Sequence, residues 1–291
     1  MDYMKKSLFW ALALVAIAGC AKEAVPAPEF HAVTESCLET KVSVGYDEFS
    51  GVYQVKWVNT DKVWINGAKY SVTPGNPATT ADFSLESGAT PSPTYKAFYP
   101  FDKYKALEGN VVKFEMPLSI TSTNHDVAFW PMYAESESNT FSFKNLCGLV
   151  AVSIRDANES RKITKVQISC TGHYLNGTAS VASDGTGVWK ASIASGDDAN
   201  RTTTVTLSTP MDIKEWGGVY FPLPPAEYGN DFKITFTYDG GGTLVKTVKS
   251  DKSINVARSK VTSIAFNIYS PSGTGNEPIG WGETYTEADF N

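Results

Sequence analysis

The sequence has few of the residues that build metal and redox sites. It holds three histidines and four cysteines among 291 residues, with no Cys-x-x-Cys pair and no His-rich spacing. A zinc site needs such closely spaced ligands. P-loop, Rossmann and HExxH patterns are absent as well. The sequence therefore predicts no metal, no cofactor and no enzymatic activity.

Two weaker chemical signals do not change that prediction. His125 is the one histidine beside a carboxylate, Asp126. Neighbours in a strand point to opposite faces, so this pair is not a catalytic dyad. The acidic stretches 183–187 and 195–200 offer oxygen ligands for calcium, but neither has EF-hand spacing. Calcium stays a minor alternative to two ordinary acidic turns.

An excess of basic residues is also missing. Lys and Arg number 25 against 31 Asp and Glu, a formal charge of −6. Nucleic-acid binding depends on basic clusters that neutralise phosphates. We therefore expect no nucleic-acid partner.

No apolar run is long enough to cross a membrane as a helix. The longest at the N-terminus, residues 8–18, has eleven residues, whereas a bilayer core of ~30 Å needs about 20. Eleven fits the apolar core of a secretory signal, and Lys5 and Lys6 precede it. An aliphatic residue, two small residues and Cys20 then form a bacterial lipobox, Ile17-Ala18-Gly19-Cys20.

These features predict a lipoprotein signal peptide over residues 1–19, lipid on Cys20 and a lipidated linker over residues 20–29. Two or three acyl chains hold a protein firmly on a membrane. The Lys22-Glu23 pair resembles an export signal to the outer leaflet of the outer membrane. The alternative is an ordinary signal peptide followed by a chance cysteine.

Helical periodicity is nearly absent; only residues 101–109 suggest a helical turn. Apolar residues alternate with polar ones in most segments, for example Phe232, Ile234, Phe236 and Tyr238, which is typical of strands. We expect an all-β protein of two antiparallel β-sandwich domains, residues 30–144 and 145–270. A hairpin turn is expected at 239–242, and a crossing loop at 221–229, where three prolines remove backbone donors.

Three cysteines follow Cys20, namely Cys37, Cys147 and Cys170. An exported protein can form disulfides, but an odd number leaves at least one thiol. Cys147 and Cys170 lie in apolar segments; they either pair with one another or are simply buried.

Several segments, in their order along the chain, resemble the fimbrillin-like subunits of type V pili. After the lipobox, residues 56–67 (KWVNTDKVWING) resemble the Trp–spacer–Asp–aliphatic strand pair of that family. Residues 141–154 resemble the segment that opens its second half. Residues 220–240 resemble its Pro-bearing loop and late strand, and residues 256–268 its closing strand.

This resemblance implies assembly rather than catalysis. Such subunits have two transthyretin-like sandwich domains and reach the cell surface as lipoproteins. A protease removes an N-terminal strand, and a strand of the next subunit fills the groove. An open sheet edge with apolar pockets accepts such a strand, and repeated head-to-tail contacts build a filament. The implied partners are other pilus subunits, the outer membrane through lipid on Cys20, and a receptor on a host or bacterial surface.

The chain departs from the family pattern in two places. Thr60 stands where the family usually has Gly before Asp61. The four arginines, Arg155, Arg161, Arg201 and Arg258, all lie outside the first domain, so cleavage there needs a lysine, and Lys41 is the best placed. Without cleavage the protein would be an anchor, a minor subunit or a non-polymerising lipoprotein.

Two strands are therefore candidates for exchange. The removable strand lies within residues 30–44. The donor strand lies in the tail, residues 271–291, with Ile279, Trp281, Tyr285 and Phe290 as anchors; the alternative is a solvated, disordered end. A second function remains open, a monomeric outer-membrane lipoprotein that binds glycans. Its usual tryptophan clusters are not evident, because the tryptophans here are spread singly.

Overall fold

The computed structural model describes residues 29–35, 55–88, 94–124, 126–183, 185–269, 284–286 and 289–290. Within these residues the chain is all-β, as predicted, apart from two 3-10 turns, η1 (Phe101–Lys103) and η2 (Asp198–Arg201). No helix in the described ranges is long and apolar enough to span a bilayer. The predicted helical turn at 101–109 reduces to η1, followed at once by a strand.

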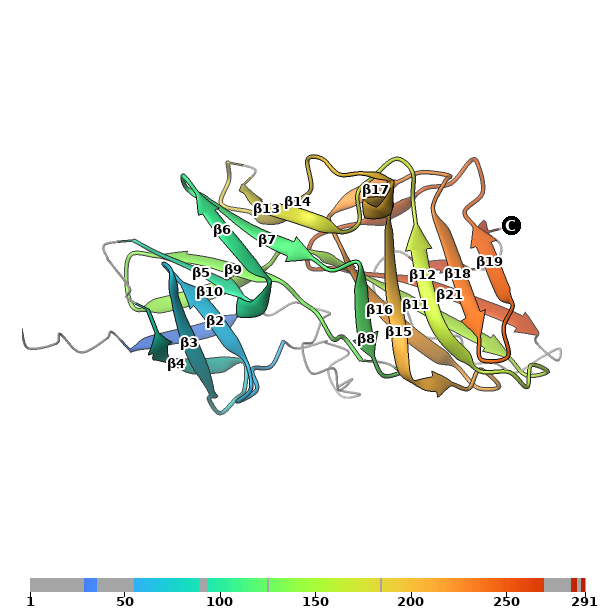
Figure 1. Ribbon diagram of the computed structural model, residues 1–291, viewed down its shortest axis with the longest axis horizontal. Coiled ribbons are helices and arrows are strands. Elements are labelled where there is room, and N and C mark those ends of the chain that lie inside the picture. Colours follow the sequence, from blue (N-terminus) through green and yellow to red (C-terminus); the bar gives the residue numbers. More distant parts are fainter. Residues whose placement is uncertain are drawn as a thin grey trace, which may run out of the picture.

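Seven strands of the N-terminal part close into a barrel, on the left of Figure 1. In sheet order they are β1 (Phe30–Thr34), β10 (Thr140–Asn145), β9 (Met132–Ser136), β5 (Tyr95–Tyr99), β2 (Lys62–Ile65), β3 (Ala68–Pro74) and β4 (Thr80–Ser87). Burial alternates along β1, β3 and β10. Inside the barrel Trp57, Phe83 and Phe143 pack edge to face. The expected sandwich is thus a closed barrel in this half.

Two larger sheets form the right side of Figure 1. One contains β16 (Gly217–Leu223), β11 (Gly148–Asp156), β21 (Val261–Tyr269) and β22 (Thr284–Thr286). The other contains β19 (Thr243–Thr247), β18 (Lys233–Tyr238), β12 (Ile163–Ser169), β15 (Thr202–Met211) and β8 (Ser119–Ser122). The rings of Phe236 and Phe266, one from each sheet, are 5.8 Å apart, so the two sheets face one another across a common core.

A fourth sheet joins the two halves, and a fifth is a short pair. The fourth contains β14 (Trp189–Ser192), β13 (Gly177–Ser183), β7 (Val111–Met116) and β6 (Tyr104–Glu108). The fifth pairs β17 (Ala226–Tyr228) with β20 (Ile254–Val256). Strands β7 and β8 precede residue 145, yet they pair with β13 and β15, which follow it. Strand pairing therefore crosses the predicted domain limit in both sheets.

The expectation of antiparallel sheets holds for most of the ladders but not for all. Among the described residues four strand pairs are parallel: β1 with β10, β11 with β21, β15 with β8, and β21 with β22. Parallel partners are joined by long connections, which a local alternation pattern does not encode. The expected hairpin at 239–242 is confirmed, since β18 pairs with β19 and Gly241 and Gly242 have φ near 85°.

The proline-rich segment 221–229 is not wholly a crossing loop as expected. Phe221 and Pro222 belong to β16, and only Pro224 and Pro225 lie between β16 and β17. Strand β16 is at the edge of its sheet, where a missing backbone donor is tolerated.

Candidate functional site

The first strand, β1, fills a slot in the barrel between β4 and β10. It runs antiparallel to β4 and parallel to β10, and Figure 1 shows it in blue at the foot of the barrel. The N–H of Thr34 donates to Thr79 O at 2.9 Å on one side, and that of His31 donates to Asn139 O at 2.8 Å on the other. Both flanking strands use β1 as a partner, so the barrel is closed only while β1 is in place.

Side chains of β1 alternate between the barrel core and solvent. Phe30, Ala32 and Thr34 face inward and are 0%, 2% and 8% exposed. The Phe30 ring lies 5.4 Å from Tyr70, 4.8 Å from Tyr95 and 5.3 Å from Phe141. The three inward side chains thus occupy pockets in the barrel core. Pockets of this kind recognise alternate side chains of an inserted strand.

The outer face of β1 is held more weakly. His31 and Asp82 are paired at 2.5 Å, but both side chains are more than half exposed, at 52% and 65%. Val33 is exposed. Exposed ion pairs contribute about 0–1 kcal/mol, so the inward face supplies most of the attachment.

Directly after β1, Glu35 enters a polar cluster with residues from the C-terminal part of the chain. Arg258 donates from both terminal nitrogens, Nη1 to Oε2 at 2.6 Å and Nη2 to Oε1 at 3.1 Å. Ser259 Oγ and the Asn145 N–H each donate to Oε2 at 3.2 Å. We call this set, Glu35 with Asn145, Arg258 and Ser259, the junction cluster.

The charge of Glu35 is stabilised by these donors. Burial alone would raise the pKa of the carboxyl, but the hydrogen bond and charge of Arg258, with Lys144 at 3.7 Å and the Asn145 N–H, bring the pKa below 4.5. A bidentate arginine–carboxylate pair is among the stronger polar contacts in proteins. Glu35 is therefore an ionised group held by matched donors.

The turn that carries Arg258 and Ser259 is itself fixed. It joins β20 to β21, and the Ser259 N–H donates to Cys147 O at 3.0 Å, where the chain passes from β10 to β11. Asn145 is fully buried and accepts from Trp130 Nε1 at 2.6 Å. The junction cluster is thus anchored to both halves of the molecule.

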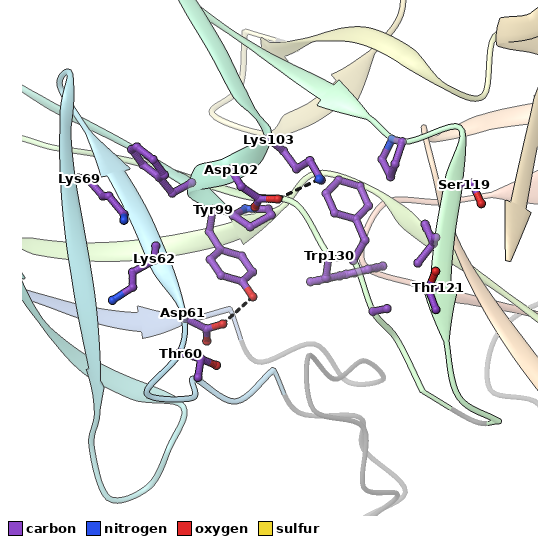
Figure 2. Close-up of a pocket in the computed structure, with 16 residues that line it drawn as sticks. Thr60, Asp61, Lys62, Lys69, Tyr99, Asp102, Lys103, Ser119, Thr121 and Trp130 are labelled. Atoms are coloured by element: carbon purple, nitrogen blue, oxygen red, sulfur yellow. Dashed lines mark hydrogen bonds and ion pairs between the residues drawn. The ribbon is translucent and has the colours of Figure 1, made fainter. Parts of the chain in front are cut away.

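A pocket of about 700 Å³ lies beside the cluster, between the barrel and β8 (Figure 2). Asp61 and Tyr99 meet on its barrel side, where Tyr99 donates to Asp61 Oδ1 at 2.9 Å. Burial raises the pKa of Asp61, although hydrogen bonds from the Val58 N–H and Tyr99 oppose that rise. Asp61 Oδ1 accepts from Tyr99 and Oδ2 accepts from the Val58 N–H. The Asp61–Tyr99 pair therefore has a structural role, which is to fix the turn after Trp57 in the Trp–spacer–Asp segment.

A second groove, of about 800 Å³, lies between the barrel and the fourth sheet. Lys96, Lys113, Glu135 and Trp189 line it. Glu135 accepts from Lys96 and from Tyr133, and the Trp189 ring packs at 5.0 Å against Tyr133. The groove presents one aromatic ring among charged groups.

The candidate calcium segments have other roles where they are described. In residues 195–200 the side chain of Asp197 caps η2, accepting from the Ala199 N–H at 2.9 Å, and Asn200 closes the same capping box. Over the described part of the chain no three His, Cys, Asp or Glu side chains form a group able to hold a metal ion. Asp184 and His125 lie outside the described residues.

The possible disulfide between Cys147 and Cys170 is not formed; both are separate, buried thiols. Burial raises the pKa of Cys147, and burial with the nearby Asp231 carboxylate raises that of Cys170 to about 11. Cys147 lies at the link between β10 and β11, whereas Cys170 follows β12 in the other sheet. In this structure the two cysteines are thus buried in different sheets as free thiols.

The tail residues that are described dock on the same chain. Strand β22 runs parallel to β21, with Tyr285 opposite Ile264. Phe290 is 5% exposed; its ring lies 4.9 Å from Phe266, and the Lys249 N–H donates to Asp289 O at 2.9 Å. Phe290 thus anchors the end of the tail to its own chain.

The remaining predicted site residues, Cys20, Lys41, Ile279 and Trp281, lie outside the described residues. Conversely, sequence reasoning missed the pairing of Glu35 with Arg258, which are 223 positions apart. The scarcity of arginine was visible, and Arg258 lies in the segment that resembles a closing strand. No local pattern links it to Glu35.

The fold is shared with a known structure. No protein-family model matches the chain, and no curated protein matches it. A putative cell adhesion protein from Bacteroides ovatus ATCC 8483 aligns with a TM-score of 0.52 at 12% identity, over 88% of this chain and 97% of that one. A second putative cell adhesion protein, from Bacteroides fragilis NCTC 9343, aligns with a TM-score of 0.47 at 8% identity, over 88% of this chain and 99% of that one.

A fimbrial neighbour is more distant. The tip fimbrial protein Mfa3 from Porphyromonas gingivalis aligns at a TM-score of 0.31 and 9% identity, over 76% of this chain and 82% of that one. Of these structures, the putative cell adhesion protein from Bacteroides ovatus shares the fold of this chain, at a TM-score of 0.52. At 12% identity the likeness establishes the fold alone.

Proposed function

We propose that this protein is a structural or accessory subunit of a cell-surface fimbria, exported as a lipoprotein and assembled by strand exchange. The observation that carries the proposal is β1: a five-residue strand near the N-terminus closes a barrel by pairing with strands on both sides. Its loss would open a slot with two backbone edges and a set of apolar pockets. Such a slot is suited to a strand from another subunit.

The processing step fits the order of the chain. Lys41 lies between β1 and residue 55, where the described chain resumes. A cut there would detach β1, the lipid on Cys20 and the linker from the rest of the molecule. The subunit would lose its membrane anchor and open its slot in one event. The two halves correspond, in this proposal, to the two transthyretin-like domains of fimbrillin-like subunits.

The tail is the proposed donor. Its apolar anchors, Ile279, Trp281, Tyr285 and Phe290, would leave their own subunit and enter the slot of the next. The contacts of β22 and Phe290 with β21 and Val248 would then be the resting state of an unassembled subunit. Deleting residues 280–291 should abolish polymer while leaving a folded monomer.

A disulfide lock on β1 tests strand exchange most sharply. Val33 and Thr80 are partners in the β1–β4 ladder, in a pair that is not bridged by backbone hydrogen bonds, where Cα atoms are about 4.5 Å apart and within disulfide range. The double variant Val33→Cys with Thr80→Cys, in a Cys37→Ser background, keeps β1 in place even after the chain is cut.

A matched control uses Thr235→Cys with Val245→Cys, the equivalent kind of pair in the β18–β19 hairpin. Oxidised β1-locked protein should form no polymer, and reduction should restore it, whereas the control should polymerise in both states. Polymer of normal length from the oxidised β1-locked protein would refute exchange at this slot.

Glycan binding by a monomeric surface lipoprotein is the second candidate. The groove lined by Trp189 favours it, because one aromatic ring lies among polar groups that can bind hydroxyls. Titration with polysaccharides, following tryptophan fluorescence in wild type and in Trp189→Ala, tests it. A saturable change that Trp189→Ala abolishes would support glycan binding; no change with either protein would count against it.

A further inference from the structure

We propose that the junction cluster is a carboxylate-binding subsite at the end of the β1 slot, and that it selects an incoming strand carrying Asp or Glu at the place of Glu35. This inference rests on the proposed strand exchange and adds its specificity. Its occupant is an extended peptide of another subunit, with an acidic residue at the end that lies nearest the C-terminal sheets.

The donors around Glu35 come from parts of the chain that stay when β1 leaves. Arg258 and Ser259 belong to the β20–β21 turn, and Asn145 and Lys144 belong to β10. All four direct donor groups at the same carboxylate, at 2.6–3.2 Å for the hydrogen bonds and 3.7 Å for the Lys144 ion pair. Removing β1 therefore removes the acceptor and leaves the donors at the slot.

The arrangement favours a carboxylate over other polar groups. The guanidinium of Arg258 uses two nitrogens on two different oxygens, a fork geometry that matches a planar carboxylate. Arg258 is also oriented by its own contacts, donating to Asn145 O at 3.1 Å and to Ser259 Oγ at 2.8 Å. A neutral amide in the same place would offer one acceptor oxygen instead of two. Its NH₂ group would face the N–H and O–H donors of the junction cluster.

The carboxylate subsite determines the register of an inserted strand, which the apolar pockets of the slot do not. Phe30, Ala32 and Thr34 fit pockets by size, and a strand shifted by two residues would still present an alternate set of side chains. A single carboxylate contact at one end of the strand, with Glu35 partly buried, fixes the register. The tail of this chain contains four acidic residues, Glu277, Glu283, Glu287 and Asp289, so a second copy carries the required chemistry.

The test uses the full chain, cut at Lys41 by a lysine-specific protease, and synthetic peptides of residues 28–36 with amidated C-termini. Each peptide competes with the resident β1, and displacement is followed by native mass spectrometry. The Glu35→Gln peptide is compared with a Glu29→Gln peptide. Both lose one charge, but Glu29 is exposed and gives only its backbone carbonyl, to Asn139 at 3.3 Å.

The Glu35→Gln peptide should bind about 10- to 100-fold more weakly than the Glu29→Gln peptide, the usual effect of losing hydrogen bonds to a charged group. In Arg258→Gln protein the difference should fall to about twofold, because the coupled partner is gone. Arg258→Lys, which keeps the charge but not the fork, should give an intermediate difference.

Two results would overturn the proposal, and they are distinguishable. Equal binding of the two peptides to wild-type protein would refute the carboxylate subsite without contradicting strand exchange. Failure of every peptide, including the natural sequence, to displace β1 would remove the exchangeable slot and the subsite with it. The peptide comparison on wild-type protein is decisive even if an Arg258 variant fails to fold.

Discussion

At the scale of single residues, Phe30 is the main attachment of β1. Its ring is fully buried and contacts Tyr70, Tyr95 and Phe141, which come from three different strands of the barrel. Aromatic contacts of this kind add about 0.5–1.5 kcal/mol each beyond the burial of area. The Phe30 side chain thus contributes much of the free energy that keeps β1 in the barrel.

Phe30→Ala should lower the free energy of unfolding by about 3–5 kcal/mol, since it leaves a cavity among packed rings. Urea unfolding followed by tryptophan fluorescence measures the change. Val33→Ala is the control on the same strand, with an exposed side chain and an expected change within about 0.5 kcal/mol. Equal losses in the two variants would show that the inward face does not anchor β1.

The junction cluster gives a pH dependence. Arg258 and Lys144 face Glu35, and together with the Asn145 N–H they bring its pKa below 4.5 in the folded protein. A carboxyl whose pKa is depressed by folding stabilises the protein above its ordinary pKa, and that contribution is lost as pH falls through the folded value. Stability from Glu35 is therefore present at neutral pH and decreases below about pH 4.5.

Glu35→Gln should be less stable than wild type by about 1–2 kcal/mol at pH 7. The difference should shrink as the pH is lowered from 4.5 towards 3, because wild type alone loses the ionised pair. Unfolding curves of both proteins at several pH values measure it, with Glu29→Gln as the exposed control. A difference that stays constant down to pH 3 would contradict the pairing.

At the scale of elements, the tail is docked by β22 and by Phe290. Phe290 covers Phe266 and bridges to Val248, while Lys252 pairs with Asp289 at 3.5 Å. A docked terminal segment can open locally without global unfolding. That property is what a donor strand needs.

Phe290→Ala should undock the tail and lower stability by up to about 3 kcal/mol, because the segment can separate locally. Hydrogen exchange of the Lys249 amide, which loses its bond to Asp289 O, should quicken while β11 and β12 stay protected. Val245→Ala on β19, an exposed position, should leave exchange at this amide unchanged. If Phe290→Ala also leaves hydrogen exchange unchanged, the docked tail contributes little to the stability of this region.

Sequence alternation predicted where strands form better than how they pair. Ile234, Phe236 and Tyr238 are buried on β18 as their period of two requires, and the glycine turn after them forms the expected hairpin. The insertion of β1 between β4 and β10 and the pairing of β8 with β15 join residues 47 to 109 positions apart. Local periodicity carries no information on such partners, and neither does it bring Glu35 to Arg258.

At the scale of the whole molecule, the barrel and the C-terminal sheets are tied together at several points. The β7–β13 and β8–β15 ladders pair strands that precede residue 145 with strands that follow it, and the junction cluster joins the end of β1 to the β20–β21 turn. The slot that β1 occupies therefore ends against the other half. An incoming strand would contact both halves, which couples its insertion to the whole subunit.

The central claim is that β1 leaves when the subunit matures. The most direct measurement is the N-terminal residue and intact mass of the protein taken from assembled fibres on the cell surface. The account predicts a chain that begins after β1, near Val42, and carries no lipid. Assembled protein that begins at an acylated Cys20 would contradict it, because β1 would still occupy its slot.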